Sequence, residues 1–398
     1  MQVKNLQSIK QSNRATVLNE IRHNEPVSRS DIARDLGLSP TTASAAVSDL
    51  IESGLVREIG QGTSTGGRRP ILLEINPKGG TVISVDVSSA FNRRIIRAAA
   101  LDLKSDILNE IKSEQIINSN DQMLAAVRGI IHDLIASPDV ELREAMAIGV
   151  SVPGLVNSEK GELVFTNINV NRLPLGPLLA EEFQAPVLVQ NSEDVAALGE
   201  VRFGVGRGCR TLLYLSVGAG VGAGLVVDGR IYQRGRTSAG EIGHITVLPD
   251  GPPCRCGNRG CLSALVSSET LVQSVQIALA EHNGADSGPL PLDVPHIMRA
   301  AQFGQPQCRD AVTRVAEWVG IAVANVVNLL NPEVIAFGGE LFEDNDYFLS
   351  LVARVARQRA LRDLVRSTRL VQSSLQRRAG LQGVAVLALD TLLDPTTD

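Results

Sequence analysis

Three cysteines within eight positions constrain the fold of this chain more than any other feature. Cys254, Cys256 and Cys261 lie in the glycine-rich segment 238–268, and His244 precedes the first of them by ten residues. Three thiolates and one imidazole make a ligand set that Zn²⁺ accepts as a closed tetrahedron. Glycines at 257 and 260 let the backbone curl around such an ion. The segment therefore predicts a structural Zn²⁺ site with no coordination position left for catalysis.

The alternative for these cysteines is a set of buried, reduced thiols, because free cysteine is among the most buried residue types. The chain has five cysteines, an odd number and mostly clustered, which argues against a disulfide scaffold. We find no signal peptide and no apolar run of membrane-spanning length, so we expect a cytoplasmic protein with no membrane partner. In such a reducing compartment, three thiols in one glycine-rich loop favour the metal.

The length of 398 residues suggests two to three domains, and 44% hydrophobic residues suffice to bury their cores. Aromatic residues make up only 3%, which argues against stacking platforms for single-stranded nucleic acid. The net charge is −5, but residues 1–70 carry nine Lys/Arg against seven Asp/Glu. This asymmetry permits a DNA-facing N-terminal part and does not by itself establish one.

Residues 1–78 have the pattern of a winged helix-turn-helix. Apolar residues repeat at helical spacing up to Pro26, and Ser28 can cap a second helix that Gly37 ends. Ser39 can cap a third helix with Pro40 at its first position. Two apolar segments, at 55–59 and 71–75, then predict the strands of a wing around the glycine-rich stretch 60–70.

The third helix predicts contact with double-stranded DNA. One face is apolar, and small polar side chains that can enter the major groove lie on the other: Thr41, Thr42, Ser44 and Ser48. In the wing, Arg68 and Arg69 can lie in a narrow minor groove, where negative potential attracts guanidinium groups. The alternative is a three-helix bundle that binds protein. The tight turn, the capped third helix and the arginine-bearing wing favour DNA.

From residue 79 the pattern becomes α/β. Successive strands, a helix, a buried strand at 146–152 and a helix at 192–204 form one unit, and the series restarts with strands at 211–217 and 221–227. The order β-β-β-α-β-α therefore occurs twice. Two such units place a cleft between them, and clefts of this kind bind small ligands outside strand ends.

Four motifs of this part closely resemble the ROK family of sugar kinases and sugar-responsive repressors: VGAGVGAG, SAGEIGH, CRCGNRGC and NLLNPEVIAFGG. The resemblance covers about residues 80–390, and the N-terminal part with its GGRRP linker resembles the repressor branch. It implies an actin-like, ribonuclease-H-like, two-lobed ATPase-type fold that carries a zinc loop. We expect a winged helix-turn-helix at 1–78, lobe 1 at 79–190 with a C-terminal helix at 379–393 returning to it, and lobe 2 at 191–378.

The resemblance also identifies the position of a catalytic base. Kinases of the family carry Asp directly after Asn, whereas Ser192 follows Asn191 here. A neutral hydroxyl cannot accept the proton of a sugar hydroxyl, and loss of a positioned base typically costs about 10²–10⁴-fold in rate. Glu193 and Asp194 come next, but we expect their side chains to project in different directions as a helix begins.

Both phosphate-binding turns of the kinases are altered. The first reads Asp86-Val87-Ser88-Ser89-Ala90, without the two glycines and the hydroxyl residue of the family's DxGGT-like hairpin. The second, GAGVGAG at 218–224, keeps its glycines but has Ala219 in place of Thr. We therefore expect no kinase activity and no catalytic residue in this chain.

The resemblance implies sugar contacts at Asn167, Asn191, Glu241 and His244. Amides and a carboxylate bond vicinal hydroxyls directionally, and a metal-bound His244 keeps its second ring nitrogen for a sugar. The alternative for these residues is local bonding in turns or solvation. Ser263 and Ser192 stand where the family has acidic sugar contacts, so the effector is an unusual sugar, an anionic derivative, or absent. Loss of two negative charges suits an anionic ligand.

The sequence thus predicts a zinc-containing, sugar-responsive transcriptional repressor. It would bind a pseudo-palindromic operator as a homodimer or homotetramer, and a sugar or sugar derivative would close the lobes and move the heads. Two other hypotheses remain. One is an active sugar kinase with a fused DNA-binding head, and the other is a regulator that answers to a protein partner and has a vestigial cleft.

Overall fold

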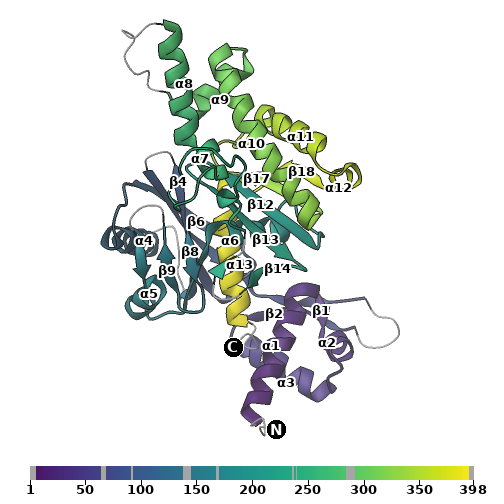
Figure 1. The fold of residues 1–398 in the computed structure, drawn as a ribbon. Coiled ribbons are helices and arrows are strands. Elements are labelled where there is room, and N and C mark those ends of the chain that lie inside the picture. The colour runs from purple at the N-terminus through teal and green to yellow at the C-terminus, as the bar shows by residue number, and fades with distance from the viewer. Residues whose placement is uncertain are drawn as a thin grey trace.

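A computed structural model describes residues 6–63, 69–90, 93–137, 145–166, 170–234, 237–238, 240–283 and 292–393. A small N-terminal head lies below two α/β lobes, and the last described helix, which ends at residue 393, reaches the head (Figure 1). Arg68 and Asn167, two residues predicted to bind ligands, lie outside the described residues.

The head is a winged helix-turn-helix, as the sequence predicted. Its strands form an antiparallel sheet in the order β1-β3-β2. The predicted caps are confirmed: Ser28 Oγ accepts from the Asp31 N–H, and Ser39 Oγ accepts from the Thr42 N–H before Pro40. The elements are α1 (Leu6–Asn24), β1 (Val27–Ser28), α2 (Arg29–Asp35), α3 (Pro40–Glu52), β2 (Val56–Gln61), β3 (Ile71–Ile75) and the 3₁₀ turn η1 (Pro77–Gly79).

Lobe 1 is built on a five-stranded sheet in the order β11-β7-β4-β5-β6. The first three strands in sequence are antiparallel neighbours, β7 adds in parallel beside β4, and β11 adds in parallel beside β7. A small sheet β10-β9-β8 lies beside it. The elements are β4 (Thr81–Ala90), β5 (Arg93–Asp102), β6 (Ile107–Gln115), α4 (Asn120–Ile135), β7 (Ala145–Val152), β8 (Leu155–Asn157), β9 (Glu162–Phe165), β10 (Asn171–Leu173), α5 (Leu175–Phe183) and β11 (Val187–Asn191).

Lobe 2 has the same strand order, β18-β17-β12-β13-β14, in which β12 corresponds to β4, β13 and β14 correspond to β5 and β6, and β17 and β18 correspond to β7 and β11. The predicted repetition of one α/β unit is therefore confirmed. Its strands are β12 (Thr211–Val217), β13 (Val221–Val227), β14 (Arg230–Ile231), β17 (Val334–Gly338) and β18 (Arg369–Gln372), with a separate hairpin of β15 (Gln233–Arg234) and β16 (Thr237–Ser238). Its helical elements are η2 (Ile242–His244), α7 (Leu262–Val266), α8 (Ser268–Asn283), α9 (Val294–Gln302), α10 (Pro306–Leu330), α11 (Asp346–Arg359), α12 (Arg362–Ser367) and η3 (Gln376–Arg378).

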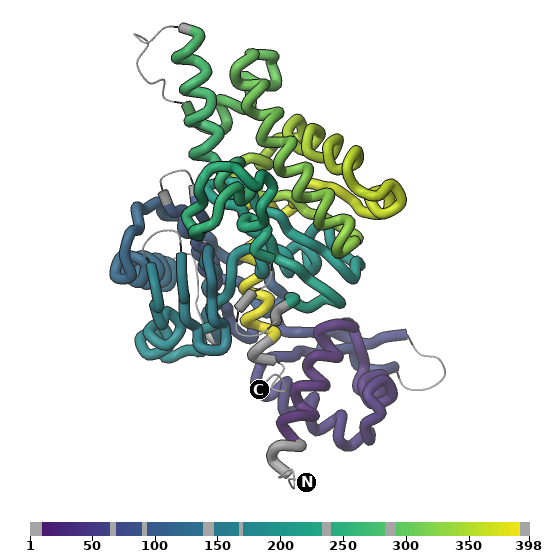
Figure 2. Tube along the Cα trace, viewed as in Figure 1, coloured from purple at the N-terminus to yellow at the C-terminus, as the bar shows by residue number. Residues whose placement is uncertain are grey.

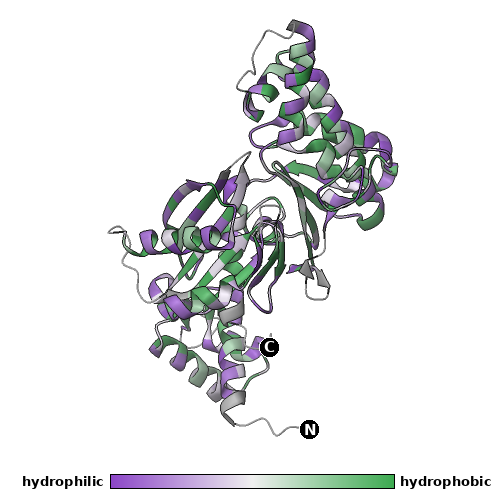
Figure 3. Ribbon diagram, turned by 60° about the vertical axis from the view of Figure 1, so that its left-hand side comes forward, coloured by the Kyte–Doolittle hydropathy of each residue, from purple (hydrophilic) through white to green (hydrophobic). Residues whose placement is uncertain are grey.

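Helix α10 is the core helix of lobe 2. Among the described residues it alone is long and apolar enough to cross a membrane, but it packs against α8, α9 and α11, and its valines at 312, 319, 323 and 327 are fully buried. Hydrophobic residues likewise gather on the strands inside both lobes (Figure 3). The apolar composition of α10 is therefore explained by burial in the protein.

Two helices, α6 (Ser192–Phe203) and α13 (Ala379–Leu393), cross each other at the centre of the molecule. Helix α13 also packs on β4 and β7 of lobe 1, and α6 packs on β12 and β13 of lobe 2. Glycines allow the close crossing: a Cβ at Gly199 would lie 2.5 Å from the Ala379 carbonyl oxygen. The tube in Figure 2 shows α13 descending from the body to the head.

The head and lobe 1 share one hydrophobic core. Buried residues of α1 and α3, such as Ile21 and Val47, belong to the same cluster as Leu101 of β5 and Leu389 of α13. Ion pairs add to this contact, because Lys104 after β5 reaches Glu25 and Glu74 of the head at 3.0 and 2.8 Å. The head is thus docked on the body, and the domain limits expected at 78/79 and 190/191 stay a prediction.

Candidate functional site

A cavity of about 1230 Å³ lies between the two lobes. The amino end of α6, the β12–β13 turn, η2 with the cysteine loop, and the start of α13 all contribute to its lining. Three of the residues that the sequence assigned to sugar binding line this cleft: Asn191, Glu241 and His244.

The predicted metal ligands come together at one wall of the cleft. The ligand atoms of His244, Cys254, Cys256 and Cys261 all lie within 4.8 Å of one another. Cys254 Sγ is 3.7 Å from His244 Nδ1, and Cys256 Sγ is 3.7 Å from Cys261 Sγ. A tetrahedron with metal–sulfur bonds of about 2.3 Å has sulfur–sulfur edges of about 3.8 Å. The four side chains therefore have the spacing of a closed tetrahedral metal site.

The loop backbone holds this arrangement. The Cys254 N–H donates to the Asn258 carbonyl at 2.8 Å, and Gly257 and Gly260 adopt φ of 93° and 66°. A Cβ at Gly260 would lie 1.6 Å from the Leu248 carbonyl oxygen, so only glycine fits there. Hydrogen bonds, the largest effect coming from the Asn258 backbone, lower the pKa of the Cys256 thiol to about 7, which favours a thiolate there, whereas burial raises the pKa of Cys261 to about 12.

His244 connects the metal loop to the cleft. Its Nδ1 faces Cys254, and its ring also lines the cavity, which leaves Nε2 for a ligand. Glu241, which precedes η2, is exposed to the same space. Ser263, where the family resemblance implies an acidic contact, lies with its Oγ against Gly243 in this wall. A carboxylate, a hydroxyl and an imidazole thus surround one part of the cleft.

Asn191 is the cap of helix α6, which is the structural alternative that the sequence left open. Its Oδ1 accepts from the N–H groups of Glu193 and Asp194 at 2.9 and 3.1 Å, and its Nδ2 donates to the Gly154 carbonyl at 2.9 Å. One Nδ2 proton remains for a ligand in the cleft. Capping and ligand contact are therefore compatible at this residue.

At the position where the family resemblance implies a kinase base, the Ser192 hydroxyl donates to Glu193 Oε2 at 2.7 Å. The two carboxylates that follow Ser192 diverge, as expected: Glu193 lines the cleft, and Asp194 is fully buried. Burial raises the pKa of Glu193, and the nearby charges of Glu241 and Asp86 raise it further. The sequence did not predict that the Glu193 side chain lies in the cleft. Among the described residues, the feature that accompanies this placement is the pair of glycines of β13 that pack against it, Gly222 and Gly224.

The glycines of the second phosphate turn have a packing role. A Cβ at Gly224 would lie 2.0 Å from the Glu193 carbonyl oxygen, and a Cβ at Gly222 would lie 2.8 Å from Glu193 Cδ. These glycines therefore let α6 approach β13. The turn itself is closed by a bond from the Gly218 N–H to the Gly220 carbonyl at 2.9 Å.

The first phosphate turn also differs from an open phosphate cradle. Strand β4 continues through Ser88, whose hydroxyl donates to the Ile95 carbonyl at 3.2 Å across the hairpin. Asp86 is buried and accepts from Ser151 Oγ at 2.7 Å. Burial raises the pKa of Asp86 to about 6, against the lowering effects of Ser151 and Arg97.

In the head, the predicted DNA residues occupy the outer side of α3. Thr41 and Ser48 are exposed, Ser44 is half-buried, and Thr42 bonds Ser39 at the helix start. Arg69 at the end of the wing is exposed.

One arginine beside α3 was missed by sequence reasoning. Arg29 Nη1 lies 3.1 Å from both Ser48 Oγ and the Ser44 carbonyl oxygen, and its Nη2 pairs with Glu58 at 3.3 Å, so a guanidinium with an acidic partner lies beside the polar face of α3. The lone Arg at the start of α2 gave no signal of this role.

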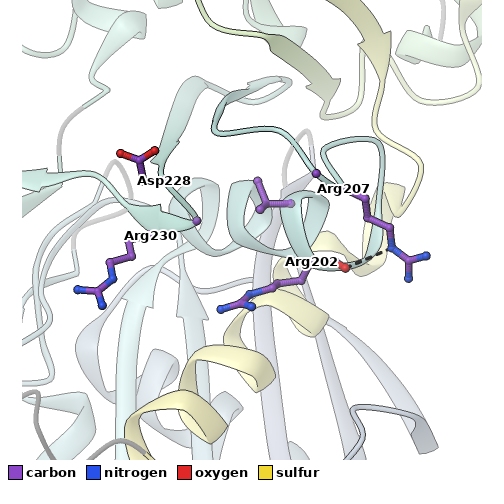
Figure 4. A pocket seen from close by; sticks show the side chains of 7 residues that line it. Arg202, Arg207, Asp228 and Arg230 are labelled. Carbon is purple, nitrogen blue, oxygen red and sulfur yellow. Dashed lines mark hydrogen bonds between the residues drawn. The ribbon is translucent and has the colours of Figure 1, made fainter. Parts of the chain in front are cut away.

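A second, smaller cavity of about 440 Å³ lies where α6 ends and β13 turns into β14. Figure 4 shows its charged side chains pointing in different directions, with Arg207 on one side and Arg202 and Arg230 on the other. They do not converge on a common point, so this cavity lacks the arrangement of a ligand site.

Comparison with known proteins agrees with the two parts of the fold. A model described as "ROK family" matches residues 93–391, and a winged helix-turn-helix DNA-binding model matches residues 13–57. The chain is 30% identical over 394 residues to the xylose repressor of Caldicellulosiruptor bescii, covering 97% of each chain. It is 31% identical over 390 residues to the N-acetylglucosamine repressor of Escherichia coli O157:H7, covering 97% of this chain and 94% of the relative.

Two solved structures differ in how much of this chain they match. A ROK family transcriptional regulator, a homologue of the E. coli MLC protein, superposes over 98% of both chains with a TM-score of 0.81 at 28% identity. The ROK hexokinase of Thermus thermophilus is covered over its whole length but matches only 80% of this chain, with a TM-score of 0.64 at 27% identity. The two-lobed body is thus similar to both, and the similarity with the regulator extends over nearly the whole chain.

Proposed function

This chain belongs to the ROK family and carries a DNA-binding winged helix-turn-helix, and from this premise we propose that it is a sugar-responsive transcriptional repressor without kinase activity. The observation that carries the proposal is the combination of a head and a polar interlobe cleft in one docked body. Two relatives that match 97% of this chain are named as repressors, whereas the hexokinase matches 80% of it. At the position of the kinase base stands a hydroxyl that already donates to Glu193.

We assign roles to the residues on this basis. The polar face of α3, together with Arg68 and Arg69 of the wing, contacts the operator. Asn167, Asn191, Glu241 and His244 bind the sugar, and the metal in the His-Cys₃ loop is a structural Zn²⁺. A zinc ion there would fix the ring of His244 and so present its other nitrogen to the cleft. The head ends near residue 78, and the protein acts in the cytoplasm as a homodimer or homotetramer.

Helices α6 and α13 offer a route from the cleft to the head. Helix α6 begins in the cleft at Ser192, and α13 begins beside it, where a Cβ at Gly380 would lie 2.3 Å from Asp86 Oδ1. The two helices cross there, and α13 then runs on to the head (Figure 1). Closure of the lobes on a sugar would therefore move two crossed rigid helices, of which α13 contacts the DNA-binding part.

The far ends of these helices meet the head at one carboxylate. Asp390 of α13 contacts Arg22 of α1 through Oδ1 and Arg202 of α6 through Oδ2, the latter at 3.3 Å. The Arg22 side chain is only 17% exposed, so this pair is partly shielded from solvent. A shift of α6 against α13 would change the Arg202 contact and release or hold Asp390 for Arg22, and this would couple the cleft to the orientation of the head.

The proposal is tested with the full-length protein and the DNA upstream of its own gene. We expect binding in a fluorescence anisotropy assay and a change in DNA affinity when a sugar of the panel binds. Thr41→Ala and Ser48→Ala should weaken DNA binding, whereas Ser350→Ala on α11, far from the head, is the matched control. Steady, sugar-dependent ATP turnover would overturn the non-catalytic assignment. DNA binding that no sugar changes, together with capture of a specific protein partner, would replace sugar by protein control.

A further inference from the structure

The proposed sugar site does not by itself say whether the ligand is neutral or anionic. The charged side chains of the cleft distinguish these two classes. In a kinase of this fold the moving phosphoryl group must lie between the acceptor hydroxyl and the glycine-rich turn. In this chain that region is bounded by Ser192 and Glu193 on α6 and by the turn that starts at Gly218. A phosphate on a sugar or at the end of a nucleotide would occupy the same region.

Glu193 places a carboxylate in this region. Its Oε1 lies 3.1 Å and its Cδ 2.8 Å from the position that a Cβ at Gly222 would take, so the group lies flat against β13. Its other oxygen accepts from Ser192 Oγ at 2.7 Å. Asp86 and Glu241 are close enough to raise the pKa of Glu193, in addition to burial. Further negative charge would meet three carboxylates here.

Glu340 places a second carboxylate at the start of the glycine turn. A Cβ at Gly218 would lie 3.5 Å from Glu340 Cβ, and Glu340 Oε2 accepts from Ser268 Oγ at 2.7 Å. The Ser268 N–H in turn donates to the Gly218 carbonyl at 2.8 Å. The turn is thus flanked by a half-buried carboxylate, that of Glu340. A nucleotide phosphate would need hydrogen-bond donors at this place.

The cations of the cleft do not offset these acids. Three of the four arginines in the described lining already face acidic partners: Arg97 faces Asp86, Arg255 pairs with Glu269 and Arg377 pairs with Glu343. The fourth, Arg299, is exposed on α9. Three of these four cations are therefore already offset by an acid of their own.

We infer that the cleft takes an uncharged polyhydroxy ligand and excludes phosphorylated sugars, sugar acids and nucleotides, because Glu193 and Glu340 hold carboxylates where a phosphate would lie. This inference rests on the proposed sugar sensing and reverses the sequence expectation of an anionic ligand. Ser192 and Ser263 remove two charges, but tertiary packing brings Glu193 and Glu340 to the cleft in their place. Carboxylates accept hydrogen bonds from sugar hydroxyls, whereas an anion between them would be buried against like charge.

The test is calorimetric titration of the full-length protein with matched pairs. The pairs are D-glucose with D-glucose 6-phosphate, D-glucose with D-glucuronic acid, and N-acetyl-D-glucosamine with its 6-phosphate, and D-xylose and ATP are added singly. All titrations are run with and without Mg²⁺, because a divalent cation can bridge carboxylate and phosphate. We expect the neutral member of a pair to bind at least about 100-fold more tightly than the anionic one and ATP to give no heat.

Variants locate the effect. Glu193→Gln and Glu340→Gln keep size and should strengthen binding of the anionic probes at least about tenfold, and Glu181→Gln on the outer helix α5 should change nothing. Thermal unfolding of each variant checks that it is folded. An anionic probe that binds wild type as tightly as its neutral parent overturns the inference and leaves sugar sensing intact. Silence of every sugar overturns sugar sensing itself, and the inference with it.

Discussion

Replacing Gly383 by alanine should separate the two helices that connect cleft and head. Gly383 of α13 lies at the crossing with α6, where an added Cβ would be 1.7 Å from the Val195 carbonyl oxygen. A second close contact, from Gly199 to the Ala379 carbonyl, supports the same crossing. Since non-bonded Cβ contacts below about 3 Å essentially do not occur, the helices must move apart by at least about 1.3 Å.

The magnitude follows from two opposing terms. Overpacking against a backbone atom that cannot rotate away costs about 3 kcal/mol, at the upper end of the usual range. Alanine in place of glycine inside a helix returns about 1 kcal/mol. We therefore expect a net loss of about 2 kcal/mol and a thermal midpoint lower by about 4–8 °C. The response of DNA binding to sugar should weaken as well, because the start of α13 lies in the cleft and its end contacts the head.

The matched control is Gly129→Ala in α4, where nothing lies within 4 Å of the added Cβ. The same chemical change should there raise stability by about 0.5–1 kcal/mol. Circular dichroism at 222 nm follows both variants through thermal unfolding. A Gly383→Ala midpoint equal to or above that of wild type would refute the argument that close helix contact requires glycine at this position.

Three further predictions concern the metal loop, the cleft and the head. Cys254→Ser or treatment with a zinc chelator should lower the unfolding midpoint, and elemental analysis should find one zinc per untreated chain; a chain purified without zinc contradicts the assignment. Burial raises the pKa of Asp86 from 3.8 to about 6, so the folded protein binds the Asp86 proton more tightly than the unfolded chain does. The contribution of Asp86 to the free energy of unfolding therefore falls as the pH rises from about 4 to 6 and is constant above pH 6. Asp86→Asn should flatten that part of the pH profile and increase the free energy of unfolding at pH 7.5 by up to about 3 kcal/mol; an unchanged profile by urea denaturation counts against it. Asp390→Asn weakens the contacts to Arg22 and Arg202 at a cost on the order of 1 kcal/mol, and should narrow the difference in DNA affinity with and without sugar; an anisotropy response equal to wild type would show that this carboxylate does not couple the parts.

Local features of the site could be predicted because their partners are near in the sequence. The cysteine loop needs ligands spread over 244–261 and glycines at the turns, and the structure places all four ligand atoms together. The caps at Ser28 and Ser39 each act on an N–H three residues ahead. Asn191 could not be assigned from the sequence, because asparagine suits both a helix cap and a sugar contact. The hydrogen bonds to the N–H groups of Glu193 and Asp194 identify it as a cap.

The sequence alone thus determined the metal loop, the winged head and the doubled α/β unit, because hydrogen bonds, capping and strand periodicity act over a few residues. The tertiary structure decided the charge of the cleft and its connection to the head. Glu340 meets Ser268 from 72 residues away, and Asp390 meets Arg202 and Arg22 across 188 and 368 residues. No local spacing encodes such pairs, since they depend on how sheets and helices pack and on where glycines let backbones approach.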